Sequence, residues 1–124
     1  MTGEVQHGSL DEGFARISEP WRPRIAAQLN GQDVRIVRVE GVFPWHAHPE
    51  ADEMFLVWKG RMRVELRDRV LELGPGEFAV VPRGTEHRTA SDEGAEVVIF
   101  EPSEVVNTGN AAVSAFTAPL GAAV

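Results

Sequence analysis

Three of the four histidines in this chain lie where their side chains could bind a metal ion. His46 and His48 are separated by one residue, so on a β-strand both imidazoles would leave the same face. Glu53 follows the short segment 49–52, which can turn the chain back, and a carboxylate on the returning strand would then lie beside the two rings. His87 comes much later, directly behind a Pro-Arg-Gly turn. These four residues are the candidate ligands.

Three neutral imidazoles and one carboxylate form a ligand set that suits Fe, Mn, Ni, Zn or Cu. They fill four positions and leave one or two open, as a catalytic metal requires. Glu50 or Asp52 could replace Glu53 as the ligand if the turn has a different shape. Paired histidines at this spacing also occur on exposed strands that bind no metal, so the spacing alone does not decide between the two.

Composition excludes several other kinds of chemistry. The 124-residue chain has no cysteine, which removes disulfides, thiolate metal sites, iron–sulfur clusters and cysteine nucleophiles. Its net charge of −7 gives no concentrated positive field, so we expect no nucleic-acid partner. No apolar run approaches the ~20 residues that span a bilayer, and the N-terminus lacks a signal-peptide pattern. We therefore expect a cytoplasmic protein without a membrane partner.

The elements that position the candidate ligands are expected to be β-strands within one domain, 1–124, whose core spans about 24–101. Turn residues separate short alternating apolar runs throughout this core, and helical segments of useful length are absent after residue 20. About seven or eight short strands, at intervals near ten residues, favour a β-sandwich or barrel. Strands are expected at 24–29, 33–40, 62–66, 77–81 and 97–100, with an Asn30-Gly31 hairpin turn between the first two.

Two segments flank the expected core. In the N-terminal segment, 1–23, Ser9 and Glu12 fit a capping box at the start of a short helix, which Pro20 and Pro23 would end. The apolar face of that helix would carry Leu10, Phe14 and Ile17. The last residues, 111–124, carry no charge, and we expect a partly ordered tail there.

Two stretches of the chain resemble the conserved motifs of the cupin superfamily. The first runs from Gly41 through His46, His48 and Glu53, with one residue fewer after the glycine than is usual. The second leads through the Pro-Arg-Gly turn to His87, and Ser91 stands where the family often has Asn. Over 34–101 the chain is similar to small single-domain bacterial cupins, of the cupin-2 or mannose-6-phosphate isomerase-like kind.

The resemblance implies an all-β fold, a double-stranded β-helix or jelly roll, with a short N-terminal helical segment. It also implies that one divalent transition metal (Fe, Mn, Ni or Zn) binds to His46, His48, Glu53 and His87. We expect an oxygenase-type enzyme that acts on a small molecule through this mononuclear site. A redox-neutral sugar or keto-acid isomerase or epimerase, and a non-catalytic barrel that binds a small molecule, are the alternatives.

Alternation along the strands predicts which residues accompany the ligands into the barrel. If Glu53 points inward, Phe55 and Val57 point inward with it, and His87 takes Thr85 and Thr89. We expect these four residues to line the substrate pocket, although Val57 could equally belong only to the core. Arg83, in the turn before His87, could meet an anionic substrate, or it could simply fill the turn and face water.

The opposite face of the strand that begins at Glu53 carries Met54, Leu56 and Trp58. Apolar residues on both faces of a strand mean that both faces are covered. We expect a second copy of the chain to cover the outer face, so that the protein is a homodimer. The alternative is a monomer in which residues 10–30, with Trp21, cover this face.

Overall fold

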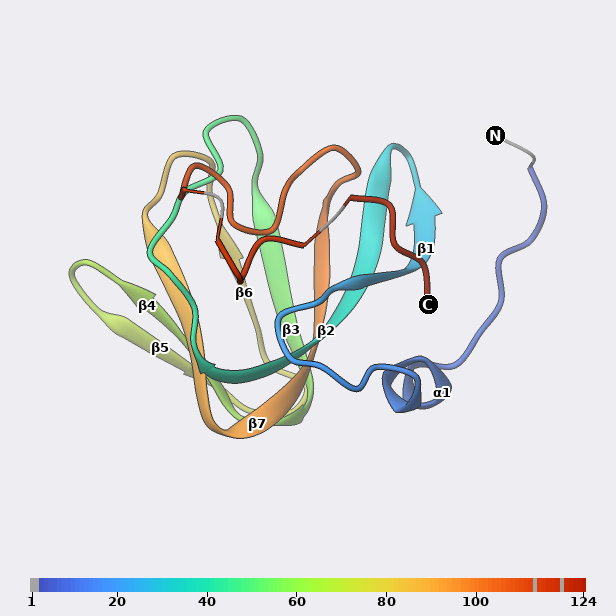
Figure 1. Ribbon diagram of the computed structural model, residues 1–124, viewed down its shortest axis with the longest axis horizontal. Helices are drawn as coiled ribbons and strands as arrows, with labels where there is room; N and C mark the ends of the chain where they lie inside the picture. Colours follow the sequence, from blue (N-terminus) through green and yellow to red (C-terminus); the bar gives the residue numbers. More distant parts are fainter. Residues whose placement is uncertain (1–2, 113, 119) are drawn as a thin grey trace.

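Antiparallel strands form a barrel, with a short helix against its outer surface, in the computed structural model (Figure 1). The structure describes residues 3–112, 114–118 and 120–124. In chain order the elements are α1 (Leu10–Ala15), β1 (Arg24–Leu29), β2 (Gln32–Val42), β3 (Glu53–Gly60), β4 (Met62–Leu66), β5 (Val70–Leu73), β6 (Phe78–Val81) and β7 (His87–Pro102). Over the described ranges, no helix is long and apolar enough to span a bilayer.

Strand β7 belongs to both walls of the barrel. Its second half pairs with β2 and β3 and so completes the order β1-β2-β7-β3-β6. Its first half pairs with β4, and β5 lies beside β4. The chain after β2 extends this second wall, since Phe43 N–H donates to Thr89 O and His46 forms an isolated bridge with His87. The expected all-β jelly roll is therefore confirmed.

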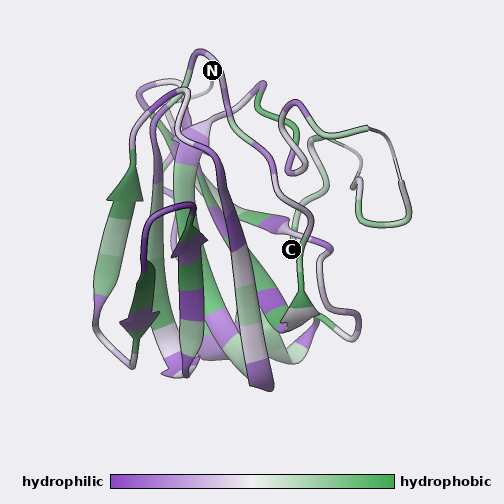
Figure 2. Cartoon of the chain, turned by 90° about the vertical axis from the view of Figure 1, so that its left-hand side faces the viewer, coloured by the Kyte–Doolittle hydropathy of each residue, from purple (hydrophilic) through white to green (hydrophobic). Residues whose placement is uncertain are grey.

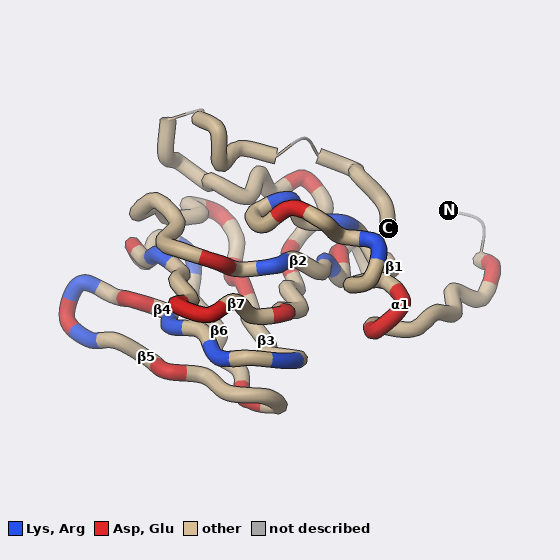
Figure 3. The backbone as a smooth tube through the Cα atoms, turned by 60° about the horizontal axis from the view of Figure 1, so that its bottom comes forward, with Lys and Arg blue, Asp and Glu red and all other residues tan. Residues whose placement is uncertain are grey.

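Local sequence signals are confirmed where they act over a few residues. Asn30 and Gly31 both have positive φ, 52° and 75°, and join β1 to β2 in a tight hairpin. The predicted strand 62–66 coincides with β4. Polar and apolar residues alternate along the strands, as Figure 2 shows. Charged residues of both signs gather at the tip of the β4–β5 hairpin (Figure 3).

The expected strand 97–100 is only part of β7, whose 16 residues begin at His87. The polar sequence Asp92-Glu93-Gly94 has the composition of a loop, but here the strand bends and continues. Ser91 holds the bend, because its Oγ donates to Arg61 O at 2.6 Å and accepts the Gly94 N–H at 3.0 Å. Gly94 has a φ of 95°, which a residue with a side chain rarely adopts.

The core has two parts, on the two faces of the larger sheet. Inside the barrel, the alternate residues of β2, β3 and β7 pack together; these are Val37, Val39, Phe55, Val57, Val97 and Ile99. Outside, Phe14 and Ile17 from the N-terminal segment pack on Ile36 and Val98. The predicted helix is confirmed, and Ser9 Oγ accepts the Glu12 N–H at 3.2 Å as an N-cap.

Helix α1 covers only part of the outer face. It packs near Leu56, and Asp11 accepts a hydrogen bond from Trp58 Nε1 at 2.8 Å. Farther along the face, Phe78 and Val80 on the edge strand β6 are 61% and 55% exposed. The outer face thus keeps an uncovered apolar region over β6.

Trp21 does not belong to this outer cover, so that part of the expectation is wrong. Its φ of 65° turns the chain toward the barrel opening, and its N–H donates to Arg38 O at 2.9 Å. The indole then packs on Phe43, with ring centroids 4.8 Å apart, and against the inner core. A reversal of the backbone at a single residue leaves no trace in hydrophobic periodicity.

The C-terminal segment returns to the barrel after β7 (Figure 1). Phe116 packs against Phe43 and Trp21 at the opening, with ring centroids 5.4 and 6.1 Å apart. Near the end, Ile25 N–H donates to Ala122 O at 2.7 Å, and Val124 N–H donates to Ile25 O at 3.0 Å. The expected tail, 111–124, therefore packs along its described residues; positions 113 and 119 lie outside them.

Candidate metal centre

The four predicted ligands lie together at one end of the barrel interior. Glu53 is the first residue of β3 and His87 the first of β7, whereas His46 and His48 come from the segment between β2 and β3. All four side chains are buried, and one ligand atom from each lies within 4.8 Å of the others. Among the residues that the structure describes, this is the one group of histidines and acids placed closely enough to bind a metal ion.

The neighbouring acids considered as alternatives to Glu53 lie elsewhere. Glu50 is exposed, and Asp52 Oδ1 accepts hydrogen bonds from Arg83 N–H and Nε at 2.9 and 3.2 Å. His46 and His48 lie outside the named strands, and His46 forms an isolated β-bridge with His87. Their imidazoles nevertheless converge, with ring centroids 5.0 Å apart.

Backbone carbonyl groups fix the orientation of two of the rings. His46 Nδ1 lies 2.9 Å from Pro44 O, and His87 Nδ1 lies 2.9 Å from Thr85 O. A carbonyl oxygen can only accept, so each Nδ1 carries the proton and donates it. A neutral ring then directs the lone pair of Nε2 toward the cluster. This is the arrangement in which histidine binds metals.

The backbone beside the third ligand, His48, is held by the loop that follows β7. Ala47 N–H donates to Asn110 Oδ1 at 2.7 Å, and Asn110 N–H donates back to Ala47 O at 3.0 Å. Gly109 lies so close that a Cβ there would come 2.4 Å from Ala47 O and 3.0 Å from His48 Nδ1. The loop therefore requires glycine at this position, both for this contact and for its φ of 55°.

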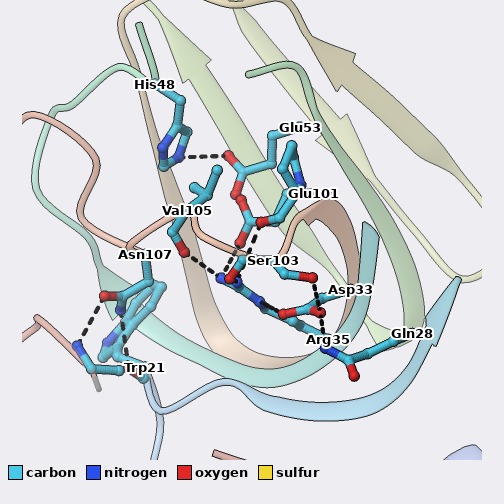
Figure 4. A network of polar contacts seen from close by, with 12 residues as sticks. Trp21, Gln28, Asp33, Arg35, His48, Glu53, Glu101, Ser103, Val105 and Asn107 are labelled. Atoms are coloured by element: carbon cyan, nitrogen blue, oxygen red, sulfur yellow. Dashed lines mark hydrogen bonds and ion pairs between the residues drawn. The ribbon is translucent and has the colours of Figure 1, made fainter. Parts of the chain in front are cut away.

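The donor set calls for a cation at its centre. Glu53 Oε1 lies 3.2 Å from His48 Nε2 (Figure 4), and it lies 3.2 Å from His87 Nε2 as well. If each Nε2 carries a lone pair, electron-pair donors face one another, and only a proton or a metal ion can join them. His48 Nε2 is buried and has no hydrogen-bond partner among the residues that the structure describes. The residues present thus fit one divalent transition metal.

Electrostatics inside the cluster keep Glu53 and His46 in their metal-binding forms. Burial raises the pKa of Glu53, but contacts with His48, His87 and Glu101 outweigh it and hold that pKa below its usual range. Burial, followed by the charge of His87, lowers the pKa of His46 from 6.5 to about 4. At neutral pH the carboxylate is ionised and the His46 ring is neutral.

The pKa of His46 predicts how stability depends on pH in chelator-treated protein. The folded state binds a proton on His46 more weakly than the unfolded chain does, so protonation of this ring favours unfolding. The stability that depends on the neutral ring is therefore complete above pH 6.5 and is lost as the pH falls toward 4. The difference in free energy of unfolding between wild type and His46→Gln should change by up to about 1.4 kcal/mol per pH unit in that window. Urea titrations at several pH values measure it, and parallel curves would contradict the prediction.

A cavity of about 30 Å³ adjoins the ligands, with room for about two water molecules. Most of its wall is apolar. None of the lysines or arginines among the described residues lines it. The lining residues are Trp21, Pro23, Val37, Val39, Phe43, His46, Glu53, Phe55, Thr89, Ile99, Glu101 and Asn107.

Two of the five expected pocket residues line the cavity, and the other three do not. Phe55 and Thr89 line the cavity. Val57 lies deeper in the inner core, because it is two residues farther along β3. Thr85 contributes its carbonyl oxygen to His87 and otherwise faces a groove on the outer surface. Arg83 is exposed and paired with Asp52, away from the cavity.

Sequence reasoning missed two polar lining residues, Glu101 and Asn107. Glu101 could have been found, because it continues the inward alternation of Val97 and Ile99. Asn107 has no such signal, since it lies in an irregular loop and is held by Phe116 O, which accepts from Nδ2 at 2.8 Å.

Comparisons with known proteins agree on the family. Residues 34–103 match the family of cupin domains designated cupin-2. A solved cupin-2 domain protein from Shewanella frigidimarina is 34% identical, with a TM-score of 0.77, over 78% of this chain and 95% of that one. A solved protein from Neisseria meningitidis is 32% identical, with a TM-score of 0.72, over 78% and 99%.

Two curated relatives match over shorter shares of their own length. The uncharacterised protein YdbB of Bacillus subtilis is 33% identical over 66 residues, which are 52% of this chain and 58% of YdbB. Germin-like protein 3-7 of rice (Oryza sativa subsp. japonica) is 33% identical over 96 residues, 70% of this chain and 41% of the relative. The chain thus spans about half the length of these curated relatives.

Proposed function

Because the chain belongs to the cupin-2 family of cupin domains, we propose that it is a metal-dependent enzyme of the oxygenase type. One divalent transition metal would bind to the three histidines and Glu53, and a small, largely apolar molecule would occupy the adjoining cavity. The metal would supply a Lewis acid and, if it is iron, the electrons that activate O₂.

The apolar lining of the cavity is the observation that carries this proposal. A sugar needs many hydrogen-bond partners, and a phosphorylated substrate needs cationic ones. Beyond the ligands, the lining residues with polar side-chain groups are Thr89, Glu101, Asn107 and the indole of Trp21, and no Lys or Arg from the described residues lines the cavity. A compact substrate with an apolar body and a pair of oxygens for the metal satisfies this lining better than a sugar does.

The chain's own residues would perform three tasks in such a reaction. Phe55, Val39 and Ile99 would hold the apolar body and exclude water from the centre. Thr89 would orient the polar end of the substrate, since both Nδ2 hydrogens of Asn107 are already donated to Trp21 O and Phe116 O. Phe116, packed on Trp21 and Phe43, covers the opening. Because the cavity has room for only about two water molecules, a catechol or a diketone would have to displace Phe116 to bind.

Elemental analysis of protein purified without oxygen or chelators is the first test. The proposal expects about one metal ion per chain, and iron would lead directly to measurements of O₂ uptake. The compounds to be tested are catechols and diketones, whose paired oxygens sit on an apolar body, and sugars, whose paired oxygens sit on a polar body. O₂ uptake with the apolar chelators alone supports the proposal.

Other outcomes of this test favour the alternative functions. Turnover of a sugar or keto acid under nitrogen, with Mn or Zn, would favour the redox-neutral isomerase. A protein that holds no metal and takes up none on titration would refute the enzyme as proposed and leave a binding barrel.

We also propose that two copies of the chain associate through the outer face of β3 and β6. The register pairs Met54 with Val80 and Leu56 with Phe78, so these apolar side chains share one face. Helix α1 covers Leu56, but Phe78 and Val80 stay largely exposed. Adjacent exposed apolar residues of this kind are typical of protein interfaces.

Val80→Asp is expected to convert this dimer to a monomer, because it would bury a charge in the interface. Val70→Asp is the matched control, since Val70 is 52% exposed on β5 in the other wall and Val80 is 55% exposed. Light scattering measures the mass of each variant. A dimer that survives Val80→Asp, or a wild type that is monomeric, would rule out this interface. Trp58 is less suitable for the test because its hydrogen bond to Asp11 also anchors α1.

A further inference from the structure

Glu101 is a buried acid that the ligand set does not use. It lies on the inner face of β7, is 1% exposed and lines the cavity beside Glu53. Acids are almost never buried this completely without a partner or a role. Both oxygens of Glu101 can be accounted for from the residues around them.

One oxygen of Glu101 is anchored by Arg35. Arg35 Nη1 donates to Glu101 Oε1 at 2.7 Å, and Arg35 is itself 4% exposed. The guanidinium is held in turn by Asp33 Oδ2 at 3.0 Å and by the carbonyl oxygens of Val105 and Ser103 at 2.7 and 2.9 Å. These contacts leave Arg35 no freedom to turn, so the Glu101 carboxyl has a fixed position.

The other oxygen of Glu101 faces the carboxylate of Glu53. The antiparallel ladder pairs Met54 with Phe100, and one further step along it sets Glu53 opposite Glu101 on the inner face. Oε2 of Glu101 is buried and receives no N–H or hydroxyl donor from the described part of the chain. Figure 4 shows the two carboxyl groups end to end, between His48 on one side and Arg35 on the other.

Two buried carboxyl groups in contact are stable when they share a proton. Glu53 and Glu101 meet this condition, since their carboxyl groups point toward each other inside the barrel (Figure 4). Because Glu53 is ionised beside the histidines, Glu101 is the donor.

We propose that Glu101 is a positioning residue of the metal centre: anchored by Arg35, its carboxyl group donates to Glu53 and sets the carboxylate facing the three imidazoles. This role rests on the proposed function only in that the four ligands bind a metal. Outer hydrogen bonds of this kind orient ligands, and their loss typically costs 10–100-fold in metal affinity.

The role can be tested with Zn²⁺ and Co²⁺ as probes on the full chain. Glu101→Gln is expected to keep wild-type affinity, because the amide can accept from Arg35 and donate to Glu53 at once. Glu101→Leu can do neither, and its affinity for Zn²⁺ in calorimetry should fall 10–100-fold. The Co²⁺ absorption spectrum should match wild type in Glu101→Gln and change in Glu101→Leu, because Glu53 is then misplaced.

Asp33→Asn is the matched control, since it removes another carboxylate from Arg35 but does not touch Glu53. It should lower the stability without changing the Zn²⁺ affinity. If Glu101→Leu does not fold, Glu101→Asp withdraws the carboxyl from Glu53 by one methylene and should show the same loss.

The outcomes separate this role from the metal centre itself. If Glu101→Leu and the wild type have equal affinity for Zn²⁺, the positioning role is overturned and the metal centre stands. A tenfold loss in Glu101→Gln as well would also overturn it, since the charge of Glu101 would then matter instead of its hydrogen bond. A wild type that binds neither ion would overturn the metal centre and this role with it.

Discussion

Replacing His48 with alanine is expected to lower the affinity for a transition metal at least tenfold while the barrel stays folded. Loss of one of four ligands costs more than ~1.4 kcal/mol of binding free energy, which corresponds to that factor. The fold should survive because His48 lies in a loop and its Nε2 has no hydrogen-bond partner that would be left unpaired in the described structure.

Calorimetry with Zn²⁺ measures the affinity, and circular dichroism with thermal unfolding checks the fold. His7→Ala is the matched control, because His7 is exposed near the N-terminus and outside the ligand cluster. Equal affinity and stoichiometry in His48→Ala and wild type would refute the assignment of this ligand. His87 is less suitable, since it is fully buried at the start of β7 and alanine there would also leave a cavity.

Arg35→Met should be strongly destabilising, by about 3–5 kcal/mol in free energy of unfolding. The variant keeps the bulk of the side chain but leaves the Asp33 carboxylate buried without its cation and the Glu101 carboxyl group without its anchor. It also leaves the carbonyl oxygens of Val105 and Ser103 without the hydrogen bonds that Arg35 donates to them. A domain of this size has only about 5–15 kcal/mol of stability in total, so the effect is large.

Urea unfolding of Arg35→Met beside Arg63→Met provides the comparison. Arg63 pairs with Asp92, which is mostly exposed, and such pairs contribute about 0–1 kcal/mol. Adding Asp33→Asn to Arg35→Met should restore part of the stability, because one uncompensated charge is gone. A loss below about 1 kcal/mol for Arg35→Met would show that the buried ion network is not needed for the fold.

Prediction from sequence succeeded where the determinants are local. The Asn30-Gly31 turn and the alternating strand 62–66 need only a few neighbouring residues, and both were predicted with accurate bounds. The ligands were found because cupin motifs keep them at fixed spacings along the chain. Their convergence in space depends on the β7 ladder, which the motifs imply without describing.

The parts that sequence missed depend on distant contacts. The bend at Gly94 within β7 is held by Ser91 and Arg61. The residues around it have the composition of a loop, so they do not predict that the strand continues. Trp21 enters the barrel through one residue of positive φ. Glu101 carried a readable signal in its alternation with Ile99, but its purpose follows only from Arg35, 66 residues away.

The position of β7 between two neighbours also determines how the protein exchanges its amide hydrogens. A strand paired along both edges opens only when the sheets separate, so its amides should exchange by global unfolding and be the slowest in the molecule. His87 and Glu101 lie near its two ends. The loop carrying His48 is held by the hydrogen bonds of Ala47 with Asn110 and of His48 with Gly84, and not by a strand ladder, so it can open locally. A bound ion should therefore dissociate when the loop carrying His48 opens, which should happen far more often than the unfolding of β7.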